Sequence, residues 1–155
     1  MFYEMRRKDR MLSEEETKDI LAKGTYGVLS TIGEDGCPYG VPVNYVYDNG
    51  SVYFHCAAGI GHKIVNMSYN NHVSFTVVTN AAVFPEGLTT KYESAIVFGT
   101  AECLKNEEKR LALIALVKKA APEFMEKGMT AIEKNFDVTD IYKINISQMS
   151  GKANK

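Results

Sequence analysis

The chain has 155 residues and a mass of 17.2 kDa, with 45% apolar and 24% charged residues. This composition is typical of a globular protein, and 12 glycines and 4 prolines are too few for a collagen-like or low-complexity chain. Apolar runs such as 95–98 are far shorter than the roughly 20 residues that cross a bilayer, and no apolar segment follows the basic residues 1–10. We therefore expect one domain over residues 1–155, with no membrane contact and a cytoplasmic location.

Eighteen basic and 19 acidic side chains leave a formal net charge of −1. Such a chain lacks the positive field that nucleic-acid binding requires, so we interpret the basic residues 6–10 as a solvated arm. The three cysteines have no CxxC spacing, and the histidines at 55, 62 and 72 lack the spacing of zinc ligands. We expect reduced thiols, no nucleic-acid partner and no metal site.

The first predicted element is a helix. Ser13 and Glu16 form a capping box at its start, and Gly24 marks its end. Three runs rich in β-formers follow it, at Tyr26–Ile32, Tyr39–Tyr47 and Ser51–Cys56. The last two are joined by Asp48-Asn49-Gly50, and an Asn-Gly pair between two such runs is a strong hairpin signal. This half of the chain is predicted to be antiparallel β.

The second half is predicted to alternate strands with helices. We expect a short helix at His62–Tyr69, a strand at His72–Thr79, a loop at Asn80–Thr90, a strand at Tyr92–Leu104 that bends at Gly99, an amphipathic helix at Glu107–Ala121, one or two helical pieces in Glu123–Phe136, and a last strand at Val138–Ile146. About six strands with peripheral helices indicate a mainly β protein, an antiparallel barrel or sandwich.

The segment 52–63 holds the most informative motif. A strand ends there, a run of small residues follows, and a helix then begins with His62 and Lys63. Glycines let backbone amides approach a ligand closely, and the N-terminus of a helix favours an anion. The segment matches neither the P-loop nor the Rossmann fingerprint. A phosphate site is one interpretation, and a flexible loop whose glycines only cap strand and helix is the other.

Two further residues have both a structural and a functional interpretation. His55, near a strand end, is either a polar residue at a rim or part of a site. Pro42 cannot donate to a β-ladder, so its strand is either a plain edge strand or one whose backbone meets a flat ligand. No arrangement of a nucleophile with an oriented base is found in the sequence.

The order of these motifs resembles the pyridoxamine 5′-phosphate oxidase-like, FMN-binding split-barrel superfamily, and within it the 5-nitroimidazole-resistance proteins. The resemblance covers nearly the whole chain. It is carried by residues 5–10, Gly27-Val28-Leu29-Ser30-Thr31, Tyr39 to Tyr45, Tyr53-Phe54-His55, Gly61-His62-Lys63, Glu93 to Gly99 and Ser150-Gly151-Lys152.

The resemblance implies a six-stranded antiparallel split β-barrel that forms a homodimer with two FMN sites at its interface. It places the backbone of Val41, Val43, Asn44 and Tyr45 along the isoalloxazine ring, and His55 near the flavin. Gly61, His62 and Lys63 would hold the phosphate, with His62 standing where many relatives carry arginine. Glu93 and Ser94 would reach the flavin from the second subunit.

The predicted function is that of an FMN-dependent oxidoreductase, which reduces nitroaromatic or other small electrophilic compounds with electrons from NAD(P)H. His55 is the candidate catalytic proton donor. The alternative is a non-catalytic carrier or sensor of flavin or haem, with one of the three histidines as an axial haem ligand. Oxidation of pyridoxamine phosphate is a weaker third interpretation, because the arginine-rich C-terminus of those enzymes is absent.

Overall fold

The computed structural model describes residues 3–155, so the first two residues of the predicted N-terminal arm lie outside it. The strands are β1 (Tyr26–Ile32), β2 (Pro38–Asn44), β3 (Val46–Asp48), β4 (Ser51–Ala57), β5 (His72–Phe84), β6 (Thr89–Cys103) and β7 (Thr139–Asn154). The α-helices are α1 (Glu14–Lys23), α2 (His62–Tyr69), α3 (Asn106–Ala120) and α4 (Met125–Asn135), and three short 3-10 helices lie at Lys8–Arg10, Pro122–Phe124 and Phe136–Val138.

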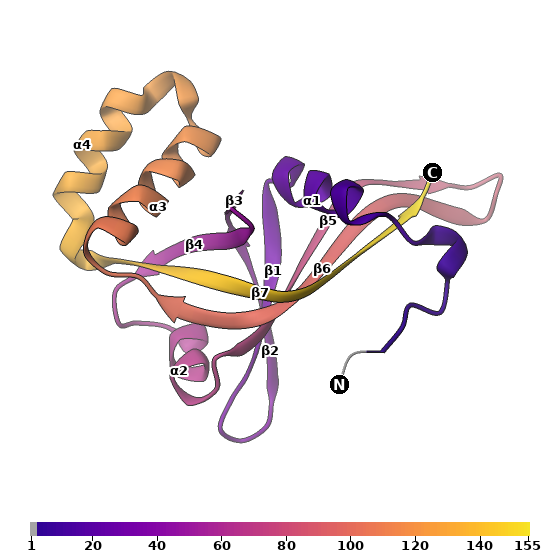
Figure 1. Cartoon of the computed structure of the whole chain (residues 1–155), viewed down its shortest axis with the longest axis horizontal. Coiled ribbons are helices and arrows are strands. Elements are labelled where there is room, and N and C mark those ends of the chain that lie inside the picture. Colours follow the sequence, from indigo (N-terminus) through magenta and orange to yellow (C-terminus); the bar gives the residue numbers. More distant parts are fainter. Residues whose placement is uncertain (1–2) are drawn as a thin grey trace.

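The seven strands form one antiparallel sheet in the order β2-β1-β5-β6-β7-β4-β3 (Figure 1). Its two outer strands are consecutive in the chain, and only Tyr45 stands between them. The sheet must therefore curl until its two ends meet at this residue. The result is a split β-barrel with peripheral helices, as the sequence predicted, and the expected six strands become seven because the predicted run 39–47 divides at Tyr45.

The local signals in the first half of the chain are confirmed. Ser13 and Glu16 form a reciprocal capping box, and Gly24 is the C-cap of α1. Asn49 and Gly50 both have positive φ, 46° and 73°, as a tight hairpin between β3 and β4 requires.

Two predicted boundaries are wrong. The segment 80–90 is not a loop, because β5 runs to Phe84 and β6 begins at Thr89, so Pro85 and Gly87 belong only to the turn between them. The last strand ends at Asn154 rather than Ile146. Its polar second half pairs with β6, from Ile146 opposite Gly99 to Asn154 opposite Tyr92. The prediction ended the strand too early because the residue pattern of this segment alone does not reveal that β6 pairs with it. The predicted bend at Gly99 is confirmed as a shift of register.

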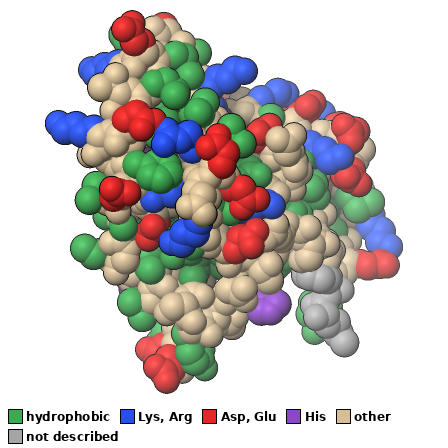
Figure 2. Space-filling model, turned by 60° about the vertical axis from the view of Figure 1, so that its left-hand side comes forward, with side chains coloured by type: hydrophobic (Ala, Val, Ile, Leu, Met, Phe, Trp, Pro, Cys, Tyr) green, Lys and Arg blue, Asp and Glu red, His purple; other side chains and the backbone are tan. Residues whose placement is uncertain are grey.

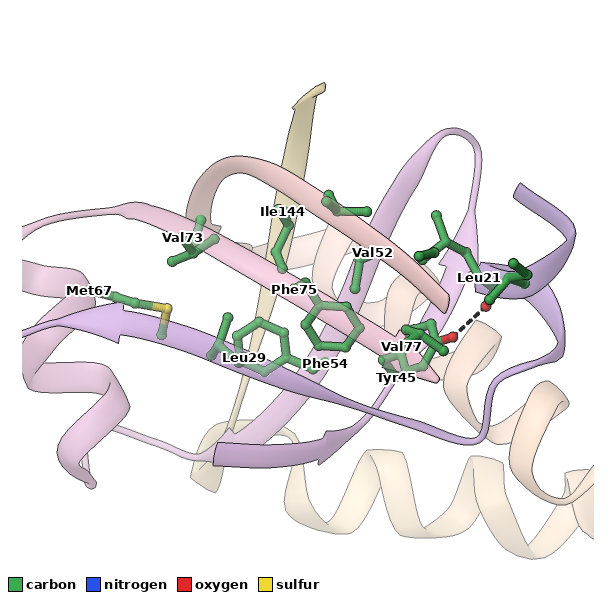
Figure 3. Close-up of a cluster of buried hydrophobic side chains, with 14 residues drawn as sticks. Leu21, Leu29, Tyr45, Val52, Phe54, Met67, Val73, Phe75, Val77 and Ile144 are labelled. Carbon is green, nitrogen blue, oxygen red and sulfur yellow. Dashed lines mark hydrogen bonds between the residues drawn. The ribbon is translucent and has the colours of Figure 1, made fainter. Parts of the chain in front are cut away.

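The main core lies inside the curled sheet, where side chains of β1, β4 and β5 meet helix α1 (Figure 3). Its largest fully buried side chains include Phe54, Phe75 and Tyr45, which is 2% exposed. The Tyr45 hydroxyl donates to the backbone oxygen of Leu21 at 2.5 Å, so the polar end of this side chain is satisfied inside the core.

A second apolar cluster joins helices α3 and α4 to one end of the barrel. Leu113 and Ile132, one from each helix, pack with Leu104 and Ile141. The two helices lie side by side as a hairpin beside β3 and β4 (Figure 1). On this side of the molecule acidic and basic side chains are intermixed, in agreement with the near-zero net charge (Figure 2). Within residues 3–155, no helix is long and apolar enough to span a membrane.

Replacing Tyr45 by phenylalanine should lower the free energy of unfolding by about 1–3 kcal/mol, because the buried Leu21 carbonyl loses its donor. Urea denaturation followed by circular dichroism measures the change. Tyr47→Phe is the matched control, since no hydrogen bond from that hydroxyl is present in residues 3–155. Equal losses in the two variants would show that the hydroxyl of Tyr45 does not stabilise the fold.

Candidate functional site

Strand β2 presents a free backbone edge. Within residues 3–155 it pairs with β1 alone, so the N–H and C=O groups along its other edge have no strand partner. Tyr39, Val41 and Val43 are half-buried and turn toward the core, whereas Pro42 and Asn44 are exposed. Pro42 therefore stands on an edge strand, and the contact of this strand with a flat ligand stays a prediction. Gly33 N donates to Cys37 O, so the alternation of the ladder turns the N–H and C=O groups of Val41 and Val43 toward β1. A flat ligand at the free edge would meet the backbone groups of Gly40 and Asn44.

The N-terminus of α2 is open to a ligand. Gly61 is its N-cap with φ of 121°, a conformation that a side chain would strain. The backbone oxygen of Gly61 accepts from Ile64 and Val65 at 3.0 and 3.2 Å, and no side chain in residues 3–155 caps the helix. The first N–H groups of α2, beside the half-buried Lys63, remain available to an anion.

His62 connects this helix to strand β2. Its ring lies against that of Tyr39, with the centroids 4.1 Å apart and the planes tilted by 30°. The contact holds the start of α2 against the first part of β2.

Asn44, Tyr45 and His55 are brought together at one end of the barrel. Val46 pairs with Tyr53, and continuing this register past the end of β3 puts Asn44 opposite His55. Asn44, Tyr45 and His55 line one cavity of about 650 Å³. His55 is exposed, and no side-chain hydrogen bond to it is present in residues 3–155. Tyr45 offers a ligand only its backbone, since its ring belongs to the core.

Cys56 lines the same cavity but is not a reactive thiol. Burial raises its pKa to about 11, and the positive charge of Lys63 opposes this shift only in part. At neutral pH the group is therefore the protonated thiol, a poor nucleophile. Lys63 therefore lies close enough to the end of β4 for its charge to act on this thiol.

Glu93 and Ser94 lie far from these residues within one chain. Ser94 pairs with Lys152 and His55 pairs with Ile141, and these two positions on β7 are separated by about 35 Å of strand. The Glu93 carboxylate accepts from Asn80 Nδ2 at 2.8 Å, and Ser94 lines a different cavity, of about 1110 Å³. Within one chain they lie apart from the residues above, so their predicted role in the site of a second subunit stays a prediction.

The polar groups at the start of α2 suit a phosphate better than a metal. In the described part of the chain, no three His, Cys, Asp or Glu side chains are grouped as metal ligands. The helix N-terminus and Lys63 instead supply N–H donors and a positive charge, which is what a phosphate needs. A glycine N-cap and a free strand edge nearby leave room for the rest of a nucleotide.

Sequence reasoning missed two residues of this region. Tyr39 holds His62 in place, and Lys119 of α3 lines the cavity with His55. The pattern of α3 predicted an amphipathic helix but carried no signal that it would pack beside the end of β4. That placement depends on tertiary contacts of the helical hairpin.

Residues 13–153 match the family model described as pyridoxamine 5′-phosphate oxidase. The chain belongs to this family. The resemblance inferred from the sequence is thereby confirmed, and the open seven-stranded barrel is the family fold seen in this member. No curated protein sequence gives a significant match.

Several solved structures are similar to this member of the family. A candidate 5-nitroimidazole antibiotic resistance protein from Bacteroides thetaiotaomicron is 23% identical, with a TM-score of 0.75 over 92% of this chain and 85% of that one. An FAD and heme binding protein from Mycobacterium smegmatis is 20% identical, with a TM-score of 0.80 over 92% and 72% of the two chains. An FAD-binding protein from Mesorhizobium loti is 26% identical, with a TM-score of 0.67 over 94% and 98%.

Proposed function

We propose that this protein is a flavin-dependent oxidoreductase that binds FMN and reduces small electron-poor compounds, nitroaromatics of the 5-nitroimidazole kind among them. The observation that carries the proposal is the meeting of the uncapped N-terminus of α2, with Lys63, and the free edge of β2 in a chain of this family. Structural relatives described as binding FAD, and one described as a nitroimidazole resistance protein, support it.

The phosphate would bind at the start of α2. The helix dipole and the free amides favour a dianion there, and the Lys63 ammonium adds a full charge. His62, held on Tyr39, offers a single ring N–H where an arginine would make a bidentate contact. Gly61 permits the phosphate to approach the backbone closely.

The ring system would lie along β2. The ring would lie beside Val41 and Val43, oriented by hydrogen bonds from the free-edge backbone groups of Gly40 and Asn44, with the side chain of Asn44 and the backbone of Tyr45 at the end of the strand. When bound, the flavin supplies two-electron transfer between a reduced nicotinamide and a small acceptor. His55 would give a proton to the acceptor, since its exposed imidazole makes no hydrogen bond within residues 3–155.

We further propose that the working protein is a homodimer in which Glu93 and Ser94 of one copy complete the flavin site of the other. The face of β6 near these residues carries Ile96 and Phe98, which are 38% and 39% exposed. Neighbouring apolar side chains exposed on a β-strand are typical of a surface that packs against a partner.

Replacing Lys63 by alanine should weaken FMN binding by about 1.5–3 kcal/mol, the range for a hydrogen bond to a charged group. Quenching of flavin fluorescence on titration gives the dissociation constant. Lys134→Ala, on the exposed surface of α4, is the matched control and should bind as wild type does. If wild type and K63A have the same affinity, the phosphate does not lie at α2.

Replacing His55 by glutamine should leave FMN affinity unchanged and slow the reduction of a 5-nitroimidazole by about 100-fold or more, because the proton donor is lost. Stopped-flow spectroscopy measures bleaching of the flavin by NADH or NADPH, and then its reoxidation by the nitro compound. His72→Gln, at the exposed start of β5, is the control. A flavin that is never reduced by a nicotinamide would indicate a carrier or sensor, and a Soret band would indicate haem.

Replacing Ile96 by glutamate should convert a dimer of twice 17.2 kDa into a monomer and weaken FMN binding at the same time. Size-exclusion chromatography with light scattering reports the mass. Leu111→Glu, at a 58% exposed position of α3, should change neither property. A wild-type monomer that binds FMN tightly would contradict the shared site.

A further inference from the structure

The cavity that Asn44 and His55 line extends beyond the proposed flavin site. Its far wall is the α3–α4 hairpin, and its volume of about 650 Å³ lies within the range of small-molecule pockets. Leu116 and Val117 of α3 and Ile132 of α4 give this wall an apolar surface. A cavity of this size and lining suits a small aromatic molecule.

Lys119 places a positive charge in this cavity. Its Nζ donates to the backbone oxygen of Gly24 at 2.6 Å and lies 4.1 Å from the centre of the Tyr45 ring. No ion pair between Lys119 and a carboxylate is present in residues 3–155. The side chain is half-buried, and burial lowers its pKa.

A half-buried ammonium without a counter-charge is electrostatically costly, because the hydration it has lost is replaced only in part. The Gly24 carbonyl oxygen and the Tyr45 ring face contact Nζ on two sides and leave room for another partner. An anionic oxygen entering from the cavity would offset the remaining cost. The charge therefore favours an acid over a neutral molecule of the same shape.

The position of the cavity connects it to the proposed chemistry. Asn44 and His55 belong both to the cavity lining and to the residues expected beside the flavin. A molecule held between the hairpin and the barrel would thus lie next to the redox centre and to the candidate proton donor. The hairpin would also shield it from water.

We propose that this cavity binds the molecule on which the flavin acts, and that this molecule is a small aromatic compound with an anionic oxygen group. Its ring contacts Leu116, Val117 and Ile132, and its anion meets Lys119. The proposal rests on the proposed flavin-dependent function for the role of the ligand, but the binding itself requires no flavin.

The test uses two fluorescent probes that differ in one group, 1-anilinonaphthalene-8-sulfonate and the neutral N-phenyl-1-naphthylamine. Both are titrated into the full chain without flavin. Replacing Lys119 by methionine should weaken binding of the sulfonate by about tenfold or more and leave the neutral probe unaffected. Lys118→Met, the exposed neighbour on α3, should bind both probes as wild type does.

A second variant fills the cavity without touching Lys119. Ala131 lines the cavity and Thr130 does not, so Ala131→Phe should exclude both probes while Thr130→Phe retains them. Both A131F and K119M should bind FMN with wild-type affinity. In the flavin-loaded protein, K119M should raise the KM for 4-nitrobenzoate and leave the KM for nitrobenzene unchanged. Circular dichroism confirms that each variant is folded.

The outcomes separate this inference from the proposed function. Probe binding that neither K119M nor A131F changes overturns the cavity site, whatever the protein does with flavin. Loss of FMN binding in A131F also overturns it, because the cavity would then belong to the flavin. If the probes behave as expected but the protein binds no flavin, the ligand site is supported and the flavin-dependent function is wrong.

Discussion

The fold depends on one residue that holds the two ends of the sheet together. Tyr45 stands between β2 and β3, the first and last strands of the sheet order, so the sheet can form only if it curls back to this point. The ring of Tyr45 is buried in the core against Phe75, at 4.9 Å between centroids, and its hydroxyl is fixed to α1 through Leu21. Packing and hydrogen bonding thus act on the same side chain, and both oppose opening of the barrel.

This closure also creates the candidate site. Because the chain leaves β2 at Tyr45, the free edge of β2 lies beside the end of β4, and the loop after β4 leads directly into α2. The contact of His62 with Tyr39 then holds the start of the helix against the edge strand. A free strand edge and a free helix N-terminus are two sources of unpaired backbone N–H groups, and a phosphate-bearing ring compound is a ligand that can use both.

Lys119 links the helical hairpin to the same point. Its ammonium lies over the Tyr45 ring and donates to the backbone oxygen of Gly24, the C-cap of α1, so α3 is attached to the barrel at the residue where the two ends of the sheet meet. The attachment leaves an apolar cavity between hairpin and barrel that has a positive charge at one side. The same residues therefore stabilise the fold and line the proposed ligand cavity. Substitutions at Tyr45 or Lys119 should be tested for their effect on the free energy of unfolding and on ligand binding.

The sequence by itself determined the elements whose signals are local. The capping box of Ser13 and Glu16, the Asn49-Gly50 hairpin and the glycine-led start of α2 each depend on a few neighbouring residues, and the structure confirms all three. The order of these motifs was also enough to indicate the family. Of the expected flavin-binding residues of α2, His62 contacts β2 through Tyr39, and the roles of all the predicted site residues await experiment.

Tertiary structure alone decided what depends on partners distant in the chain. The second half of β7 is a strand because β6 supplies its hydrogen bonds, and the division of the run 39–47 follows from burial of Tyr45 in a core that α1 and β5 complete. The cavity beside Lys119 exists only because α3 and α4 pack on Leu104 and Ile141. Pairing and packing across long separations leave no periodic mark in the sequence, since each segment alone fits several partners.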